Sequence, residues 1–96
     1  MTDKDLVTKR LWITGRVQGV WYRAWTAEQA QALNLTGYVR NRSDGRVEAV
    51  LSGPDHNVQA MISKCYQGPP LANVTEIQVE DAEDLSASDF QTLLTK

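Results

Sequence analysis

The chain has 96 residues, of which 42% are hydrophobic and 23% are charged, and this composition predicts one globular domain. Its formal charge of −2 argues against nucleic acid as a partner, because nucleic-acid-binding proteins usually carry a net basic face. The only cysteine, Cys65, cannot form an intramolecular disulfide and fits a reducing compartment.

The start of the chain shows no targeting signal. Residues 1–5 are charged and lack the apolar core of a signal peptide. No apolar run approaches the roughly 18 residues that are needed to cross a membrane. We therefore expect a cytoplasmic protein without a membrane partner, a monomer by default. It should be a single domain over residues 1–96, with a flexible N-terminus over about residues 1–6.

The first half of the chain predicts a strand and then a helix. Leu11 and Ile13 alternate with Arg10, Trp12 and Thr14, which is the period of a half-buried strand, and Val7 extends the same face. Residues 22–33 contain no Gly or Pro and favour an amphipathic helix. Its apolar face is formed by Tyr22, Thr26, Ala30 and Leu33. Asn34 suits the left-handed position that ends a helix.

A hairpin and a second helix follow. Strand patterns at 36–42 and 46–51 flank Ser43-Asp44-Gly45, a strong signal for a tight turn. Ser52-Gly53-Pro54 is predicted to open the second helix, with Pro54 in its first turn. The buried stripe of that helix is predicted to be Val58, Met61, Ile62 and Cys65, and Gly68-Pro69-Pro70 should end it.

The last part of the chain predicts two more strands. Ile77 and Val79 mark a fourth strand, with Val74 on its opposite face, and residues 80–84 are predicted to be a solvated acidic loop. A short strand is predicted at 90–94. This element order is typical of an α+β, ferredoxin-like sandwich. We expect a mostly antiparallel sheet of four to five strands with two helices on one face, whose strand order is open beyond the hairpin.

The stretch from Gly15 to Arg23 leads from the first strand into the first helix and is the main candidate site. Unpaired N–H groups at a helix start attract anions, and a glycine-containing loop can curl such groups around a phosphate. Arg23 would add a planar fork that matches two phosphate oxygens, although it would oppose the helix dipole without an anion. An ordinary connecting loop, with Arg23 in a surface salt bridge, explains the spacing equally well. The loop lacks the Lys-Ser/Thr ending of a nucleotide-binding P-loop and the third glycine of a dinucleotide-binding motif, so a nucleotide site is not expected.

Other candidate residues are few. Asn41, near the hairpin turn, either bonds to the backbone or offers one donor and one acceptor to a water molecule. His56 is expected to be solvated and Cys65 to pack as a small hydrophobe. We find no metal-ligand spacing and no nucleophile paired with a base, and the acids at 81, 83 and 84 suit a solvated surface.

Together, these segments resemble the acylphosphatase family. Its pattern Gly-Arg-Val-Gln-Gly-Val, any residue, Phe or Tyr, then Arg is matched by residues 15–23. Its later motifs are matched by residues 37–41, 45–47, 52–54 and 68–71, so the similarity runs from about Leu11 to Val79. The departures are modest: Asn34 stands where Gly is frequent, and Asn73 where a basic residue is frequent.

The resemblance implies a ferredoxin-like fold and hydrolysis of the carboxyl-phosphate bond of acyl phosphates, with no metal or cofactor. It implies that Arg23 binds the phosphate and that Asn41 orients the attacking water. The backbone N–H groups that complete the phosphate-binding loop would be those of Gln18, Gly19, Val20, Trp21, Tyr22 and Arg23. Inorganic phosphate, as the product, should be a competitive inhibitor.

Two alternatives remain open on the same fold. One is a non-catalytic phosphate-binding or regulatory module that keeps the loop without turnover. The other is an RNA-recognition type of domain, in which Trp12 would stack a base, but its aromatic-glycine motif is missing and the net charge is negative. For Trp21, packing is favoured over a surface that contacts the acyl group.

Overall fold

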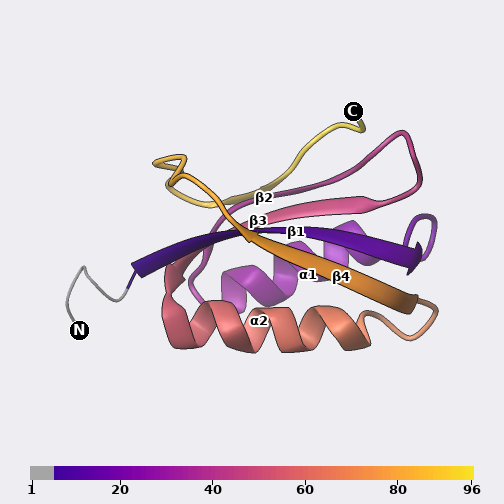
Figure 1. The fold of residues 1–96 in the computed structure, drawn as a ribbon, viewed down its shortest axis with the longest axis horizontal. Helices are drawn as coiled ribbons and strands as arrows, with labels where there is room; N and C mark the ends of the chain where they lie inside the picture. The colour runs from indigo at the N-terminus through magenta and orange to yellow at the C-terminus, as the bar shows by residue number, and fades with distance from the viewer. Residues whose placement is uncertain (1–5) are drawn as a thin grey trace.

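The computed structural model describes residues 6–96 and contains two helices and one five-stranded sheet (Figure 1). The elements are β1 (Leu6–Arg16), α1 (Tyr22–Ala32), β2 (Thr36–Asn41), β3 (Val47–Pro54), α2 (Asp55–Gln67), β4 (Asn73–Asp81) and β5 (Phe90–Thr92). Residues 1–5, which carry most of the expected flexible N-terminus, lie outside the described residues. None of the helices within residues 6–96 is long and apolar enough to cross a membrane.

The sheet has the strand order β4-β1-β3-β2-β5. Neighbouring strands are antiparallel except β2 and β5, which run parallel. Both helices cover the same face of the sheet (Figure 1). The predicted ferredoxin-like α+β sandwich is therefore confirmed, and the strand order, which the sequence left open, places β3 at the centre of the sheet between β1 and β2.

The core lies between the sheet and the two helices. Leu11 and Ile13 from β1 are fully buried there, as the alternating pattern predicted. The predicted faces of both helices are confirmed, because Tyr22, Thr26, Ala30, Val58, Met61 and Cys65 are all buried. Ile62 and Leu33 are half-buried against the same core. Asn34 has a φ of 58°, so the predicted left-handed position after α1 is also confirmed.

The second helix begins one residue later than predicted. Residues 52–54 continue β3 and pair with the start of β1, where Val7 faces Gly53 and Thr8 faces Ser52. The hydroxyl groups of Thr8 and Ser52 share a hydrogen bond of 2.8 Å. Pro54 therefore ends the strand and precedes α2 instead of lying in its first turn. The long partner strand provides hydrogen bonds that local sequence signals could not reveal.

Val74 lies on the core side of β4, so the prediction that placed it on the opposite face is wrong. The register moves from Thr14 facing Glu76 to Gly15 facing Val74, which leaves Thr75 as an extra residue in a β-bulge. The extra residue brings both Val74 and Ile77 to the core. Gly15 is needed at this point, because its φ is 129° and an added Cβ would lie 2.2 Å from the Asn73 carbonyl oxygen.

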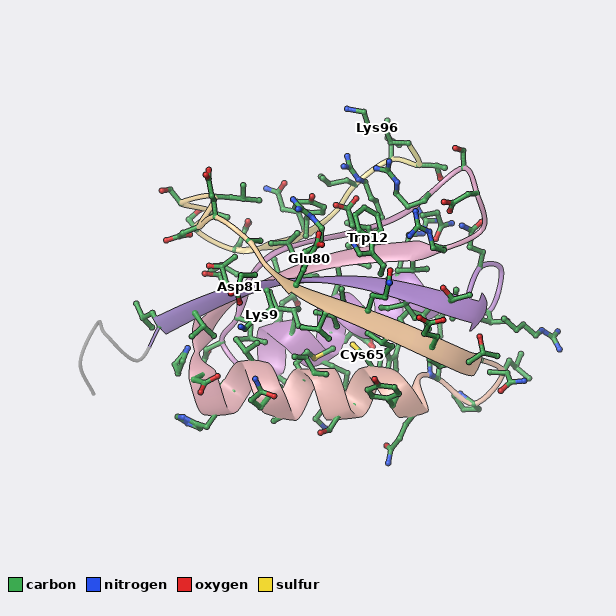
Figure 2. The ribbon with its side chains drawn as sticks, viewed as in Figure 1. Lys9, Trp12, Cys65, Glu80, Asp81 and Lys96 are labelled. Carbon is green, nitrogen blue, oxygen red and sulfur yellow. The ribbon has the colours of Figure 1, made fainter. Side chains whose placement is uncertain are left out.

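The acidic segment is only partly a loop. Glu80 and Asp81 belong to β4, opposite Arg10 and Lys9 of β1. Lys9 forms an ion pair with Asp81 (Figure 2), and the Arg10 guanidinium lies 3.5 Å from the Glu80 carboxylate. The loop prediction was wrong for these two acids because their cationic partners are distant in the sequence. The last strand ends at Thr92, two residues earlier than predicted.

Candidate active site

The loop that joins β1 to α1 is anchored by two valines. Val17 and Val20 are buried in the core, whereas Gly19 between them is exposed and has a φ of 73°. The apolar side chains therefore hold the loop against the protein while its backbone remains accessible. This anchoring follows from the sequence, because buried valines that flank a flexible glycine leave the main chain at the surface.

The backbone N–H groups of this loop have no backbone partners in the part of the chain that the structure describes. No N–H group of residues 18–24 donates to a backbone carbonyl within residues 6–96, and the first such bond at the helix start runs from Trp25 N–H to the Trp21 carbonyl at 3.1 Å. No described side chain caps α1, and its first turn contains no acidic residue. A run of unpaired donors at the positive end of a helix is suited to an anion.

Tyr22 fixes the start of α1 to α2. Its hydroxyl donates a 2.6 Å hydrogen bond to the Cys65 carbonyl, and burial raises the pKa of the phenol above its ordinary range. Burial also raises the pKa of the Cys65 thiol to about 12, so this thiol is neutral at physiological pH. Cys65 lies between α2 and the sheet (Figure 2), and its predicted packing role is confirmed.

A cleft of about 370 Å³ brings the loop, the helix start and the end of β2 together. Arg23 and Asn41, which the sequence analysis paired only by resemblance, both line this cleft. The complete lining comprises Val17, Gly19, Trp21, Tyr22, Arg23, Ala24, Asn41 and Thr92. Of the predicted phosphate-binding residues, Gln18 and Val20 are not among these. Arg23 forms no ion pair with any residue from 6 to 96, which leaves its guanidinium available to an anion.

Asn41 reaches the cleft because side chains alternate along β2. Val39 and Asn41 share the face that the helices cover, whereas Arg40 points to the other face, where it bonds to Glu48. The Asn41 side-chain oxygen is buried, and no group in the described chain donates a hydrogen bond to it. A backbone bond of this oxygen, one interpretation of the sequence, is therefore not found among residues 6–96. An unsatisfied buried acceptor at the edge of a cleft is costly and suits a ligand or water contact.

The side chain of Gln18 holds the loop to the hairpin, a contact that the sequence analysis missed. Its amide nitrogen donates to the carbonyl oxygens of Arg42 and Arg46, both at 2.8 Å. Arg42 and Arg46 also share a backbone bond of 2.8 Å where the two strands leave the sheet. Gln18 therefore joins the loop to the residue that follows Asn41. No local pattern signals this contact, because its partners are backbone atoms of a distant turn.

The arginines around Asn41 belong to a separate network on the face of the sheet without helices. Glu48, only 2% exposed, accepts hydrogen bonds from Arg10, Arg40, Arg42 and Tyr38. Burial opposes the ionisation of Glu48, but the hydrogen bonds from Arg40 and Tyr38 outweigh it and hold the pKa of this carboxyl below its ordinary value. Arg40 and Arg42 are therefore committed to Glu48.

Trp12 lies on the same outer face (Figure 2). Its indole N–H donates to Glu80 at 3.1 Å, and the Arg46 guanidinium lies 4.6 Å from its ring centre. The edge of the ring is therefore hydrogen-bonded and an arginine lies over its face, as expected for a structural role in the charged network. His56 is exposed at the start of α2 and does not line the cleft. No group of three or more metal-ligating side chains gathers within residues 6–96.

The fold and the cleft define a class of small α+β sandwich proteins with an open loop and an arginine at one helix start. Comparison with known proteins identifies the class further. A profile of the acylphosphatase family matches residues 9–92. An acylphosphatase of Rhizorhabdus wittichii is 50% identical over 86 residues, which cover 90% of this chain and 87% of the relative. An acylphosphatase of Azoarcus sp. is 46% identical over 93 residues, which cover 97% of this chain and 95% of the relative.

The likeness extends to solved structures. The structure of an acylphosphatase from Coxiella burnetii matches this chain with a TM-score of 0.91 at 33% sequence identity. The match covers 97% of this chain and 100% of the other. The chain therefore belongs to the acylphosphatase family of hydrolases, and the resemblance found in its sequence is confirmed.

Proposed function

We propose that this chain hydrolyses acyl phosphates to a carboxylate and inorganic phosphate in the cleft between the β1–α1 loop and Asn41. The observation that carries this proposal is the run of backbone N–H groups at residues 18–24 that have no backbone partner within the described chain. Most of these residues line the same cleft as Asn41. A donor cluster alone suits any anion. An amide with an unsatisfied buried oxygen beside it adds a group that can direct a water molecule.

The loop and Arg23 would bind the phosphoryl group. The N–H groups of Gln18, Gly19, Val20, Trp21, Tyr22 and Arg23 would donate to its oxygens, and the Arg23 guanidinium would contribute a bidentate contact. Phosphoryl transfer demands mainly positioning and stabilisation of charge on the equatorial oxygens. Donors held in advance where that charge develops are each worth about 2.7–4 kcal/mol in the reaction barrier.

Asn41 would hold the attacking water in line with the bond that breaks. The water oxygen forms a bond to phosphorus, while the bond from phosphorus to the carboxyl oxygen breaks and its electron pair leaves with the carboxylate. One water proton passes to a phosphoryl oxygen, which yields the carboxylate and dihydrogen phosphate. Because the leaving carboxylate is a weak base, this route needs no general acid and no protein base.

The proposal is tested by acyl phosphate hydrolysis in excess chelator, with the wild type beside Arg23→Gln. We expect turnover by the wild type, competitive inhibition by inorganic phosphate, and a higher KM with much slower turnover in the variant. The variant should lose about 100-fold or more in kcat/KM, the size expected for one lost charge-stabilising donor. A wild type that binds phosphate without turnover would favour the non-catalytic module instead.

The protein would act as a monomer in the cytoplasm and use no metal or cofactor. We expect the protein to elute from a sizing column as a single 10.7 kDa species at micromolar concentration. We also expect it to keep full activity after treatment with a chelator. A stable dimer, or activity that returns only with an added divalent metal, would contradict this part.

A further inference from the structure

Trp21 is the one tryptophan whose position the fold does not explain. The residue is 73% exposed, so the packing role favoured by the sequence is wrong. Trp25, by contrast, packs against the core and lies 5.4 Å from the Tyr22 ring, and Trp12 is bonded to Glu80. An exposed indole gains little from burial, so Trp21 contributes little to the stability of the core.

The backbone conformation of Trp21 does not favour a tryptophan either. This residue has a φ of 71°, a left-handed conformation that favours glycine or asparagine over a bulky side chain. It precedes the first residue of α1, where a smaller residue would satisfy the backbone equally well. Neither packing nor local conformation therefore accounts for a tryptophan here.

The cleft provides a reason. Trp21 lines the cleft together with Arg23 and Asn41. Of the other apolar residues that line it, Val17 and Tyr22 are buried and present little surface, and the half-buried Ala24 presents only a methyl group. Trp21 is thus the large apolar surface that an incoming substrate meets beside the phosphate-binding loop.

The chemistry of the proposed reaction decides what meets that surface. In-line attack places the leaving group on the side of the phosphorus opposite the attacking water. The phosphoryl group would be held by the loop and the water by Asn41, so the acyl group is the part of the substrate left to contact other residues. A flat apolar acyl group can stack on an indole, whereas an acetyl group is too small to cover it.

We propose that Trp21 determines acyl specificity and that the cleft favours acyl phosphates with an aromatic acyl group. This inference rests on the proposed hydrolysis and names the substrate class of the same site. Stacking of one aromatic pair is worth about 3- to 10-fold in affinity, so the preference should appear as a ratio of that size between an aromatic and a small substrate.

The test compares kcat/KM for benzoyl phosphate and acetyl phosphate in three proteins. Trp21→Asn removes the ring and suits the left-handed backbone, whereas Trp21→Tyr retains an aromatic ring. We expect the ratio of benzoyl to acetyl kcat/KM to fall about 3- to 10-fold in Trp21→Asn and to fall less in Trp21→Tyr. The ratio cancels any shared effect of the substitution on the phosphate-binding loop. Trp12→Phe, on the opposite face of the sheet, is the matched control and should leave the ratio unchanged.

The outcomes separate this inference from the function on which it rests. An unchanged ratio in Trp21→Asn, or equal losses with both substrates, would overturn the specificity role while leaving acyl phosphate hydrolysis intact. A fall of the same size in Trp12→Phe would overturn it as well. If the wild type hydrolyses neither substrate, the proposed function fails and the inference fails with it.

Discussion

At the scale of single residues, the direction of each side chain decides its chemistry. Arg40 and Asn41 are neighbours in β2, yet Arg40 bonds to the buried Glu48 at 2.8 Å while Asn41 lines the cleft on the other face. The alternation of a strand is sufficient to separate them. Arg40 therefore belongs to the structural network around Glu48, whereas its neighbour Asn41 belongs to the candidate site.

Asn41→Ala should lower kcat by at least about 100-fold, because a water that is no longer directed attacks from unproductive positions. The inhibition constant of inorganic phosphate should change little, since the loop and Arg23 would bind the anion. Steady-state kinetics with phosphate as inhibitor measures both effects. A large loss of phosphate affinity in this variant would mean that Asn41 binds the anion instead of orienting water.

Cys65 should resist alkylation in the folded protein. Burial raises the pKa of its thiol to about 12, so the thiolate fraction at pH 8 is on the order of 10⁻⁴. The folded pKa lies above that of the unfolded chain. Cys65 therefore contributes stability that is fully present below about pH 8.5 and is lost as the pH rises towards 12.

Mass spectrometry after iodoacetamide treatment at pH 8 checks this, with the protein in urea as the control. Native protein that reacts as fast as the unfolded chain would contradict it.

Cys65→Ala and His56→Ala should both keep their activity. An inactive His56 variant would show that the site has been assigned to the wrong part of the molecule.

At the scale of elements, the candidate site depends on how the β1–α1 loop is held against the β2–β3 hairpin. Gln18 makes this connection through two hydrogen bonds to carbonyl groups of the hairpin. Val17 and Val20 hold the same loop from the core side. The loop is therefore fixed from two directions, and the contact of Gln18 with the hairpin also sets the position of the loop relative to Asn41.

Gln18→Ala should lower the free energy of unfolding by about 1–2 kcal/mol, because two hydrogen bonds are lost. It should also lower kcat about 10-fold, since a small displacement between the loop and Asn41 misaligns the reacting groups. Urea unfolding and steady-state kinetics measure the two effects. Gln59→Ala, on the exposed face of α2, is the matched control. A loss of stability with unchanged kcat would show that Gln18 does not align the site.

At the scale of the whole molecule, the sheet separates two environments. Its helix-covered face holds the apolar core, and its other face holds Glu48 and the arginines that surround it. The network supplies several hydrogen-bond donors to the buried Glu48 carboxylate. A buried charge without such partners would be strongly destabilising. Both hairpin strands and β1 contribute to it, so it joins the three central strands of the sheet.

Glu48→Gln should destabilise the protein at pH 7 by about 2 kcal/mol, a value reduced from that of a fully buried pair because the arginines are partly exposed. The pKa of Glu48 is lowered in the folded state below its ordinary value of 4.5. Its contribution to stability is therefore present above about pH 4.5 and is lost as the pH falls through the folded pKa.

Urea unfolding at pH 7 and pH 3 measures this, and the difference between wild type and variant should shrink at pH 3. The exposed Glu83→Gln is the matched control and should show little change at either pH. An equal difference at both pH values would mean that the charge of Glu48 contributes nothing and that only its packing matters.

The sequence by itself determined the order of the elements, the buried faces of both helices, the tight turn at Asp44-Gly45 and the family. These features depend on residues that lie close together in the chain, where the periods of 2 and 3.6 and the needs of a turn are directly visible. It also selected Arg23 and Asn41 as candidates, through the match of residues 15–23 and 37–41 to one motif pair.

Only the tertiary structure decided the strand order, the bulge at Thr75 and the pairing of Glu80 and Asp81 with β1. It alone showed that one cleft contains both Arg23 and Asn41, that Gln18 reaches the hairpin and that Trp21 is exposed. Each of these depends on contacts between segments distant in the sequence. Such contacts form through the packing of whole elements against one another, and no local pattern records which partner a strand or side chain will meet.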